Sequence, residues 1–507
     1  MLPIDYQLRM KELLSDEYDG YLRSFEEPGY KALRLNPLKL DRAQFPVFIR
    51  EFKNELMDSG TEVGFERVPW EECGYYCFGP EDLKLGNQVF HEAGAYYVQE
   101  PSAMKPVTML DVRPGLRVLD MCAAPGGKST QIAGYMEGKG VLISNEIIPS
   151  RAEILSGNME RLGVRNAVVL NETPQRLSSV FAGWFDRILV DAPCSGEGMF
   201  RKNPEAVGEW SVQNVKKCAA RQDEILDYAA TMLKQGGILV YSTCTFSLEE
   251  DEECIDRFLK RHPDYELVCH EKLFPHKIRG EGHFVAKLAR KGDGGDGYFA
   301  PVRGGDRKER RKKGSRVSER LSLFDAFLSS DIADAGLDGQ YIFFGDNLYL
   351  LPEGSPEPDG LKTLRPGLWL GSFAGGGGKA ERFVPSHSLA LTLRPCEAAR
   401  VVDITINEAE AFIEGLTLPL PDTYEGDDKG WCLVCCKGIS LGFGKIVSGM
   451  VKNHYPKGLR RNHYAKHNSG WFQTFVMRGT TKWWSPYDID WPPTIRHKGG
   501  PLAGDAL

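Results

Sequence analysis

Two cysteines and an aspartate follow short apolar runs that are typical of buried strands. Asp191 and Cys194 lie in DAPCSG directly after RILV, and Cys244 directly follows GILVYST. If both runs are strands of one parallel sheet, their carboxyl ends open into the same crevice, so two thiols and a carboxylate converge there. A free cysteine is usually an inert small hydrophobic residue. These two lie in polar turns at strand ends, which favours a chemical role.

Such a pair of thiols suits methyl transfer to C5 of cytosine, a carbon that is a poor nucleophile. A thiolate that adds to C6 turns C5 into an enamine-like carbon able to attack an electrophilic methyl group. A carboxyl group at N3, protonated or sharing a proton, would neutralise the charge that develops on the ring. A base must then remove the C5 proton before the thiolate can leave, so two cysteines with distinct roles make chemical sense.

A glycine turn precedes these residues in the chain. LRVLD leads into CAAPGGK at 122–128, where Gly126 and Gly127 let backbone N–H groups approach a ligand at the start of a helix. The next apolar run, VLISN, ends at Glu146, where a carboxylate can accept hydrogen bonds from ribose hydroxyls. A glycine turn alone is more often structural, but the turn and the strand-end acid together indicate an adenosine-bearing cofactor. The three-glycine dinucleotide fingerprint is absent, which disfavours a nicotinamide dehydrogenase.

The elements that would position these residues form an α/β pattern. Between about 96 and 290, apolar runs alternate with helix-like segments, as in a parallel sheet. Before this region, FPVFIREFKNELMDSG has helical spacing and KALRL reads as a strand. After it come a Gly-rich charged stretch, a helix in LSLFDAFLSSDIADAG, strands in QYIFFGDNLYLLPEG and a glycine-rich loop at 371–383. The remainder has short apolar runs broken by Gly and predicts a small β-rich domain.

The charge is distributed unevenly along the chain. The formal net charge is −7, yet 429–487 contains ten Lys or Arg and no acid. In that segment the cations alternate with aromatic residues, among them Trp431, Phe443, Tyr455, Tyr464, Trp471, Trp483 and Trp484. Cations beside aromatic faces suit single-stranded or irregular RNA. A solvated face is the usual reading of a basic run, and it fits 301–320 better than 429–487.

Composition excludes several classes of protein. The 507 residues are 42% hydrophobic and 26% charged, which is ordinary globular usage, and no run is long enough to span a bilayer. The start of the chain lacks the features of a secretory signal. The 12 scattered cysteines read as reduced thiols of a cytoplasmic protein. CLVCC at 432–436 contains a CxxC pair without the partners of a zinc site, so no metal is expected.

CAAPGGK, DAPCSGEGMFRK and STCTFSLEEDEE, in this order, resemble the motifs of the Nop/Sun-type RNA (cytosine-5) methyltransferases, which use S-adenosylmethionine. The whole layout, with YVQEPSAM at 97–104 and GKIVSGMVKNHYPKGLRR near the C-terminus, is similar to the RsmF-type bacterial enzymes. The resemblance implies a Rossmann-like catalytic core, an α/β N-terminal extension and a β-rich PUA-like C-terminal domain. We therefore expect an RNA-binding extension (1–95), a catalytic domain (96–290), a basic linker (291–318), an α+β connecting domain (319–383) and a PUA-like RNA-binding domain (384–507).

The resemblance also assigns roles to individual residues. Cys244 would attack C6, Cys194 would promote product release, and Asp191 would contact the base near the cofactor. Lys202 corresponds to a basic position near the substrate. Thr173 stands where the family usually has an Asp near the adenine, beside Asn171 and Glu172. The implied cofactor-binding residues are Cys122, Ala123, Ala124, Pro125, Gly126, Gly127, Lys128, Glu146, Arg151, Thr173 and Asp191. In the C-terminal segment we assign RNA contact to Lys452, Lys457, Arg460 and Arg461.

The resemblance implies ribosomal RNA or the small ribosomal subunit as partner. We expect a monomer without membrane association. Two alternatives remain open at this stage. The same chemistry could act on transfer RNA, because the catalytic motifs do not encode the RNA. The second alternative is a ribosome-assembly factor whose methyltransferase core is vestigial. The intact Cys244, Asp191 and glycine turn disfavour it.

Overall fold

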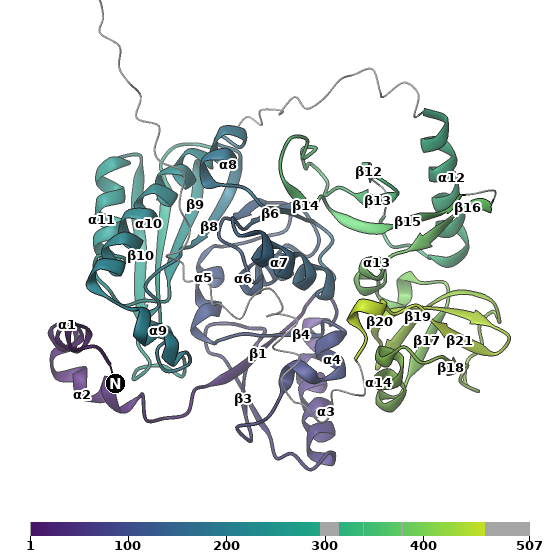
Figure 1. Ribbon diagram of the computed structural model, residues 1–507, viewed down its shortest axis with the longest axis horizontal. Helices are drawn as coiled ribbons and strands as arrows, with labels where there is room; N and C mark the ends of the chain where they lie inside the picture. The colour runs from purple at the N-terminus through teal and green to yellow at the C-terminus, as the bar shows by residue number, and fades with distance from the viewer. Residues whose placement is uncertain (1, 295–313, 338, 377–378, 462–507) are drawn as a thin grey trace, which may run out of the picture.

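The computed structural model describes residues 2–461 apart from 295–313, 338 and 377–378. At its centre lies an eight-stranded sheet of order β10-β11-β9-β8-β5-β6-β7-β14 (Figure 1). The five strands from β5 to β9 are parallel, whereas β10, β11 and β14 are antiparallel to their neighbours. The strands are β5 (Arg117–Asp120), β6 (Val141–Asn145), β7 (Ala167–Leu170), β8 (Phe185–Asp191), β9 (Leu233–Thr243), β10 (Tyr265–Leu273), β11 (His283–Arg290) and β14 (Thr363–Arg365). The predicted α/β sheet is confirmed.

Helices cover both faces of this sheet, which explains why its strands read as nearly continuous apolar runs. On β5, Val118 faces the side chains of α5, α6 and α7, whereas Leu119 faces α8, α10 and α11. Leu142 and Ile143 alternate in the same way on β6. The helices are α5 (Lys105–Met109), α6 (Gly127–Met136), α7 (Pro149–Arg161), α8 (Pro174–Val180), α9 (Pro204–Glu209), α10 (Val212–Met232) and α11 (Glu252–Arg261).

The described residues of the N-terminal part form four α-helices and a sheet of order β2-β3-β1-β4. Its strand on KALRL and its helix on FPVFIREFKNELMD are the predicted ones. Tyr6 of α1 packs on Phe200 and Trp210, which follow β8, and Tyr21 of α2 packs on Phe246, which follows β9. The elements are α1 (Ile4–Leu14), α2 (Tyr18–Arg23), β1 (Lys31–Leu35), α3 (Phe45–Asp58), β2 (Gly64–Arg67), β3 (Gly74–Phe78), α4 (Val89–Glu92) and β4 (Tyr96–Val98).

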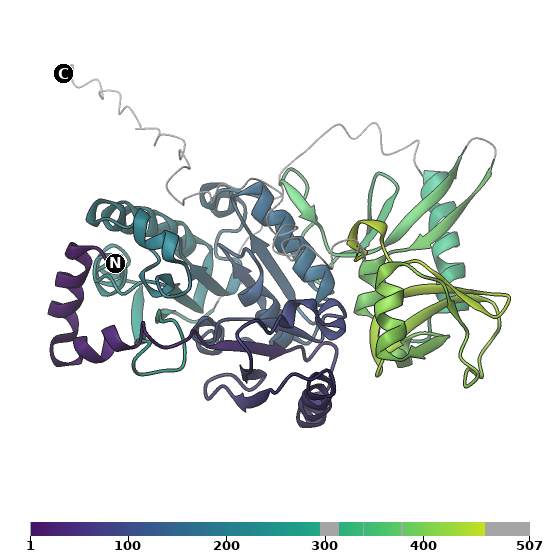
Figure 2. The ribbon, with the colours of Figure 1, turned by 60° about the horizontal axis from the view of Figure 1, so that its bottom comes forward.

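The C-terminal half contains two further sheets, of order β12-β13-β15-β16 and β17-β19-β20-β21-β18. It lies at the opposite end of the molecule from α1 and α2 (Figure 2). Its elements are α12 (Gly314–Asp331), β12 (Tyr341–Phe344), β13 (Asn347–Leu350), β15 (Leu368–Gly376), β16 (Lys379–Pro385), α13 (His387–Thr392), β17 (Val401–Ile404), α14 (Ile406–Glu414), β18 (Leu418–Pro419), β19 (Gly430–Cys436), β20 (Ile439–Val447) and β21 (Met450–Asn453). Short 3-10 helices occupy Ser15–Glu17, Arg42–Gln44, Leu85–Asn87, Ser102–Met104, Glu197–Met199, Pro395–Glu397 and Lys457–Leu459.

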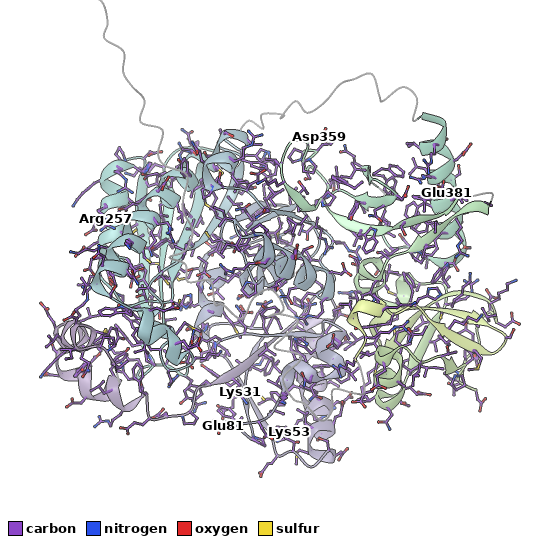
Figure 3. All side chains as sticks on the ribbon, in the orientation of Figure 1. Lys31, Lys53, Glu81, Arg257, Asp359 and Glu381 are labelled. Carbon is purple, nitrogen blue, oxygen red and sulfur yellow. The ribbon has the colours of Figure 1, made fainter. Side chains whose placement is uncertain are left out.

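Two local predictions in this half are wrong. Apart from 377–378, which lie outside the described residues, the segment 371–383, expected as a loop, belongs to the antiparallel pair β15 and β16, in which Phe373 lies opposite Phe383. Gly375 and Gly376 lie at the end of β15, and the apolar residues on either side pair and pack. The helix α12 begins at Gly314, inside the stretch expected to be a linker, because Arg320 forms ion pairs with Asp346 and with Glu381, which is labelled in Figure 3. Residues 301–313 of the basic run lie outside the described residues.

The N-terminal part and the last domain share one hydrophobic core, which includes Phe52 of α3 and Phe90 of α4 from the first and Phe412 of α14 and Ile446 of β20 from the second. The ammonium group of Lys39 is buried between them and donates to the Ser440 hydroxyl at 2.9 Å. These contacts join the two ends of the chain into one body. Within the described residues, no helix is long and apolar enough to cross a membrane.

Asn36 connects the N-terminal part to the catalytic part, and its removal tests that connection. Its buried side-chain amide donates to the carbonyls of Gly94 and Leu162, each at 2.8 Å. Asn36→Ala leaves both carbonyls unpaired, so we expect a loss of roughly 2–4 kcal/mol in the free energy of unfolding. Urea unfolding measures it, with Asn54→Ala on the exposed side of α3 as the control. A loss equal to that of the control would contradict this role.

Candidate active site

The two cysteines singled out in the sequence meet at the carboxyl edge of the central sheet. The parallel pairing of β8 with β9 places Asp191 opposite Ser242. The turns that follow bring Cys194 Sγ to 3.3 Å from Cys244 Sγ. The backbone N–H of Cys244 also points at Cys194 Sγ, at 3.3 Å. Both thiols are partly exposed, so a substrate can reach them.

The two thiols are not equivalent. The hydrogen bond with Cys244 and burial both raise the pKa of Cys194 well above the usual value of a thiol. Cys194 therefore keeps its proton and can donate it to the sulfur of Cys244. This asymmetry suits one nucleophile and one proton carrier.

Asp191 is held in its ionised form. Burial alone would raise its pKa, but Lys128, whose ammonium lies 2.7 Å from Oδ2, and His283 lower the pKa below its usual range. Oδ1 accepts a hydrogen bond from the Ser242 hydroxyl at 2.8 Å. Burial lowers the pKa of Lys128, but the pairing with Asp191 outweighs it and raises that pKa overall. Of the two states expected for a carboxyl group here, protonated or sharing a proton, the neighbouring cation favours the second.

The glycine turn lies between β5 and α6, as predicted. Gly126 has a φ of 110° and is the residue before the first residue of α6, and a Cβ there would lie 3.1 Å from Leu155 Cδ1. Cys122, Ala123, Ala124 and Pro125 form the rest of the turn, with Gly127 and Lys128 in the first turn of α6. The backbone N–H groups at this helix end are suited to an anionic group of a ligand.

Glu146 directly follows β6 and is 3% exposed. One of its oxygens accepts the backbone N–H of Ile148 at 3.0 Å, and Arg151 lies 3.5 Å from the other. Arg151 also donates to the Ala124 carbonyl at 2.8 Å, which ties the acid to the glycine turn. The carboxylate retains free acceptor positions, so Glu146 fits the hydroxyls of a ribose.

Thr173 has a structural task. Its hydroxyl accepts the backbone N–H of Arg176 at 3.2 Å and caps α8. The neighbouring Glu172 uses one carboxylate oxygen to accept the backbone N–H of Lys362, at 2.7 Å. The position where an acid near the adenine was expected is thus a helix cap, and the adjacent acid is bound to a distant segment of the chain.

The structure adds three residues that the sequence did not single out. His283 Nε2 lies 3.6 Å from Asp191 Oδ1 and is buried without a hydrogen-bond partner. Glu250 accepts the backbone N–H of Ser195 at 3.0 Å and so shapes the turn that carries Cys194. Glu197 accepts the N–H of Phe246 at 3.0 Å and links that turn to the one after Cys244. The signal for the two glutamates was their presence in DAPCSGEGM and STCTFSLEE, whereas His283 lies on a strand with no polar pattern.

The proposed RNA-contacting residues lie in several settings. Lys202, Lys452 and Lys457 are exposed. Arg460 donates to the Tyr455 carbonyl at 3.1 Å, and Arg461 lies 3.3 Å from Glu92 of α4. Among the aromatic residues of this segment, Phe443 and Tyr455 are buried and serve the core. Tyr464, Trp471, Trp483 and Trp484 lie outside the described residues.

The cysteines of CLVCC lie in β19, where Cys432, Cys435 and Cys436 are buried. Burial raises the pKa of Cys432 and of Cys436 to about 12. Thiols with such pKa values are poor metal ligands at neutral pH. Across the part of the chain that the structure describes, no group of three His, Cys, Asp or Glu side chains could hold a metal ion.

Comparison with known proteins decides the family. Residues 107–301 match the family described as 16S rRNA methyltransferase RsmB/F. Residues 2–101, 326–393 and 399–461 match the N-terminal, first C-terminal and PUA domains of RsmF. The chain is 32% identical over 495 residues to the ribosomal RNA small subunit methyltransferase F of Vibrio vulnificus (strain YJ016), covering 91% of this chain and 98% of that protein. The chain belongs to the RsmF family of 16S ribosomal RNA methyltransferases.

Other relatives agree with this assignment. The protein of the same name from Aeromonas salmonicida is 31% identical over 476 residues, covering 88% of this chain and 94% of that one. The crystal structure of NSun6 from Pyrococcus horikoshii shares the fold, with a TM-score of 0.51 and 22% identity over 57% of this chain and 99% of that one. The methyl donor is S-adenosylmethionine, and the glycine turn and Glu146 have the chemistry to hold it. Bound there, it supplies an electrophilic methyl group.

Glu250 makes the stability of the turn carrying Cys194 depend on pH. Burial raises the pKa of this carboxyl group to about 8. The folded chain therefore binds this proton more tightly than the unfolded chain, and the stabilisation is lost as pH rises from about 4.5 to about 8. Glu250→Gln keeps an acceptor for Ser195 and removes the ionisation. We expect the stability of the variant, measured by urea unfolding from pH 5 to 8, to fall less with pH than that of the unmodified protein.

The control is Glu253→Gln on the exposed side of α11, which leaves the pH dependence unchanged. Equal pH slopes for Glu250→Gln and the unmodified protein would contradict the assignment.

Proposed function

We propose that this protein methylates C5 of specific cytosines in small-subunit ribosomal RNA, in the cytoplasm, through a covalent bond between Cys244 and C6. The distance of 3.3 Å between the Cys194 and Cys244 sulfurs, beside an ionised Asp191, carries this proposal. Methylation of a base nitrogen or of a ribose needs no pair of thiols, whereas methylation of C5 uses both.

In the first step the Cys244 sulfur adds to C6 of the cytosine. Asp191 orients the base by accepting a hydrogen bond from its exocyclic amino group. Negative charge then develops towards N3, and Lys128, 2.7 Å from Asp191, is the nearest source of a proton for the carboxylate to share with N3. The carboxylate is thus proton-sharing only after the base has arrived. C5, now enamine-like, takes the methyl group.

In the second step the product is released. Cys194 gives its proton to the departing Cys244 sulfur, 3.3 Å away, and takes the proton from C5 in exchange. The electron pair of the C5–H bond re-forms the C5–C6 double bond as the bond between C6 and Cys244 breaks. Cys194 supports this step, because its raised pKa lets it carry a proton beside the departing sulfur. Both thiols then return to their starting state.

The exposed lysines offer contacts to the RNA backbone. Lys202 follows the turn that carries Cys194, so it is suited to a phosphate next to the target nucleotide. Lys452 and Lys457 lie in the last sheet and the turn after it. We assign Arg460 and Arg461 a smaller contribution to RNA binding, since both guanidinium groups already contact other residues of the protein. Transfer RNA as substrate remains the alternative to test.

Replacement of Cys194 tests the mechanism directly. With Cys194→Ala, release fails, so a protein–RNA adduct that resists denaturant accumulates with 16S RNA and S-adenosylmethionine. Cys244→Ala forms no adduct and has no turnover, although it binds S-adenosylmethionine normally. Cys269→Ala, which removes an exposed thiol on β10, is the control and behaves like the unmodified protein. Turnover by Cys244→Ala, or adduct formation without it, would remove Cys244 as the nucleophile.

The RNA contact is tested by a salt titration. Replacing Lys452 and Lys457 together with Ala removes two cations, and each phosphate contact contributes about 0.7 to the slope of log K against log salt for single strands. We expect weaker binding of small-subunit RNA and a slope flatter by about 1.4. A double replacement of the exposed Lys139 and Lys260, on the catalytic part, is the control. An unchanged slope in the Lys452 and Lys457 double variant would mean that this basic segment is only a solvated face and does not contact RNA.

A further inference from the structure

A short strand from the C-terminal half completes the catalytic sheet beside the cofactor site. β14 pairs antiparallel with β7, with Thr363 opposite Leu170 and Arg365 opposite Val169. Almost two hundred residues separate the two strands in the sequence. Figure 1 shows β14 extending from the C-terminal half to the edge of the central sheet. Asp359, labelled in Figure 3, lies just before β14 in the chain.

The strand contacts the loop that follows β7. The backbone N–H of Asn171 donates to the Lys362 carbonyl at 2.8 Å, and the N–H of Lys362 donates to Glu172 at 2.7 Å. Both bonds come from the backbone of Lys362, whose side chain is exposed. A single residue of the C-terminal half thus holds both ends of the dipeptide Asn171–Glu172.

That dipeptide is bound in turn to the residues around Glu146. The Asn171 side chain donates to the Glu146 carbonyl at 2.7 Å and to the Ile147 carbonyl at 2.9 Å. The Asn145 side chain donates to the Glu172 carbonyl at 2.9 Å and accepts its backbone N–H at 2.9 Å. A continuous hydrogen-bonded path therefore runs from β14 to the proposed ribose-binding acid.

The attachment of β14 is firm. Arg365 is buried and donates to the Val164 carbonyl at 2.5 Å, before β7 begins. Leu361 packs on the core of one face of the sheet and Leu364 on the core of the other. Apolar contacts on both faces and a buried guanidinium keep the strand in register.

The strand order locates the adenine end of the cofactor. A methyl donor held by the glycine turn and Glu146 would have its methyl group towards Asp191 and the cysteines, at the ends of β8 and β9. Since β5 lies between β8 and β6, the loop after β7 is on the other side of Glu146 from the cysteines, where it would contact the adenine. That loop is the one held by Lys362.

We infer that residues 360–365 are a positioning element of the cofactor site. The backbone of Lys362 holds in place the loop after β7, at Asn171–Glu172, which would contact the adenine. The inference rests on the proposed function in one respect, because it takes the glycine turn and Glu146 as the cofactor site. Because linkage is reciprocal, cofactor binding stabilises the docking of β14 by the same free energy by which docked β14 favours the cofactor. The C-terminal half thereby acts on methyl-donor affinity as well as on RNA.

Hydrogen–deuterium exchange on the full-length chain tests the inference without any substitution. With saturating S-adenosylhomocysteine, the amides of 360–365 should exchange at least threefold more slowly, together with those of 122–128 and 146–151. Asn347–Leu350 in β13 is the internal control and should not change. Slowing at 122–128 and 146–151 with no change at 360–365 would overturn the inference. If the amides of 122–128 also fail to exchange more slowly, the cofactor assignment is overturned, and this inference with it.

A matched pair of variants separates backbone from side chain. Lys362→Pro removes the N–H that Glu172 accepts, and Lys362→Ala keeps it while removing the exposed side chain. We expect the Kd for S-adenosylhomocysteine to rise at least fivefold in Lys362→Pro and to stay within twofold in Lys362→Ala. An unchanged Kd in Lys362→Pro, or an equal rise in both variants, would overturn the role of the backbone. If Lys362→Pro does not fold, the exchange experiment decides.

Discussion

The parallel pairing of β8 with β9 brings a carboxylate and two thiols together at one edge of the central sheet. Each of these strands ends in a turn that carries one cysteine, and the 3.3 Å between the sulfurs depends on the register that sets Asp191 opposite Ser242. Side chains alternate along a strand, so a shift of one residue would turn the Asp191 side chain to the other face of the sheet. The buried runs on both faces fix that register, and the hydrophobic core is therefore also what aligns the site.

Several buried carboxyl groups surround this edge of the sheet, and their burial is unfavourable. Burial raises the pKa of Asp120 and of Asp251 to about 7, as it does for Glu250 to about 8. At Asp191 the neighbouring Lys128 and His283 together outweigh burial, whereas at Asp251, which lies 3.0 Å from Lys272, burial still prevails. One carboxylate at this edge of the sheet therefore stays ionised while its neighbours hold their protons more tightly. A preorganised charge of this kind stabilises developing charge without reorganisation during the reaction.

Much of this arrangement could be predicted from the sequence, because local signals and fold rules agreed. Apolar runs followed by CAAPGGK, DAPC and STC located three strand ends, and the parallel topology required them to meet. The features that could not be predicted depend on contacts between residues far apart in the sequence. Nothing local in LKTLR indicates a strand that pairs with β7, since its partner lies almost two hundred residues earlier. The glycine-rich stretch within 371–383 read as a loop because the pairing of β15 with β16 is decided by the apolar residues that flank it on both sides. The cation beside Asp191 could not be predicted, because Lys128 lies in a different motif and only the fold brings the two side chains together.

The central claim is that this chain forms 5-methylcytosine in small-subunit ribosomal RNA by means of Cys244. The most direct test is bisulfite sequencing, at nucleotide resolution, of ribosomal and transfer RNA from cells that carry the gene, lack it, or carry only Cys244→Ala. We predict that specific marks in the small-subunit RNA disappear without the gene and stay absent with Cys244→Ala, while transfer RNA is unchanged. Marks that persist with Cys244→Ala would contradict the mechanism, and marks lost only from transfer RNA would contradict the substrate.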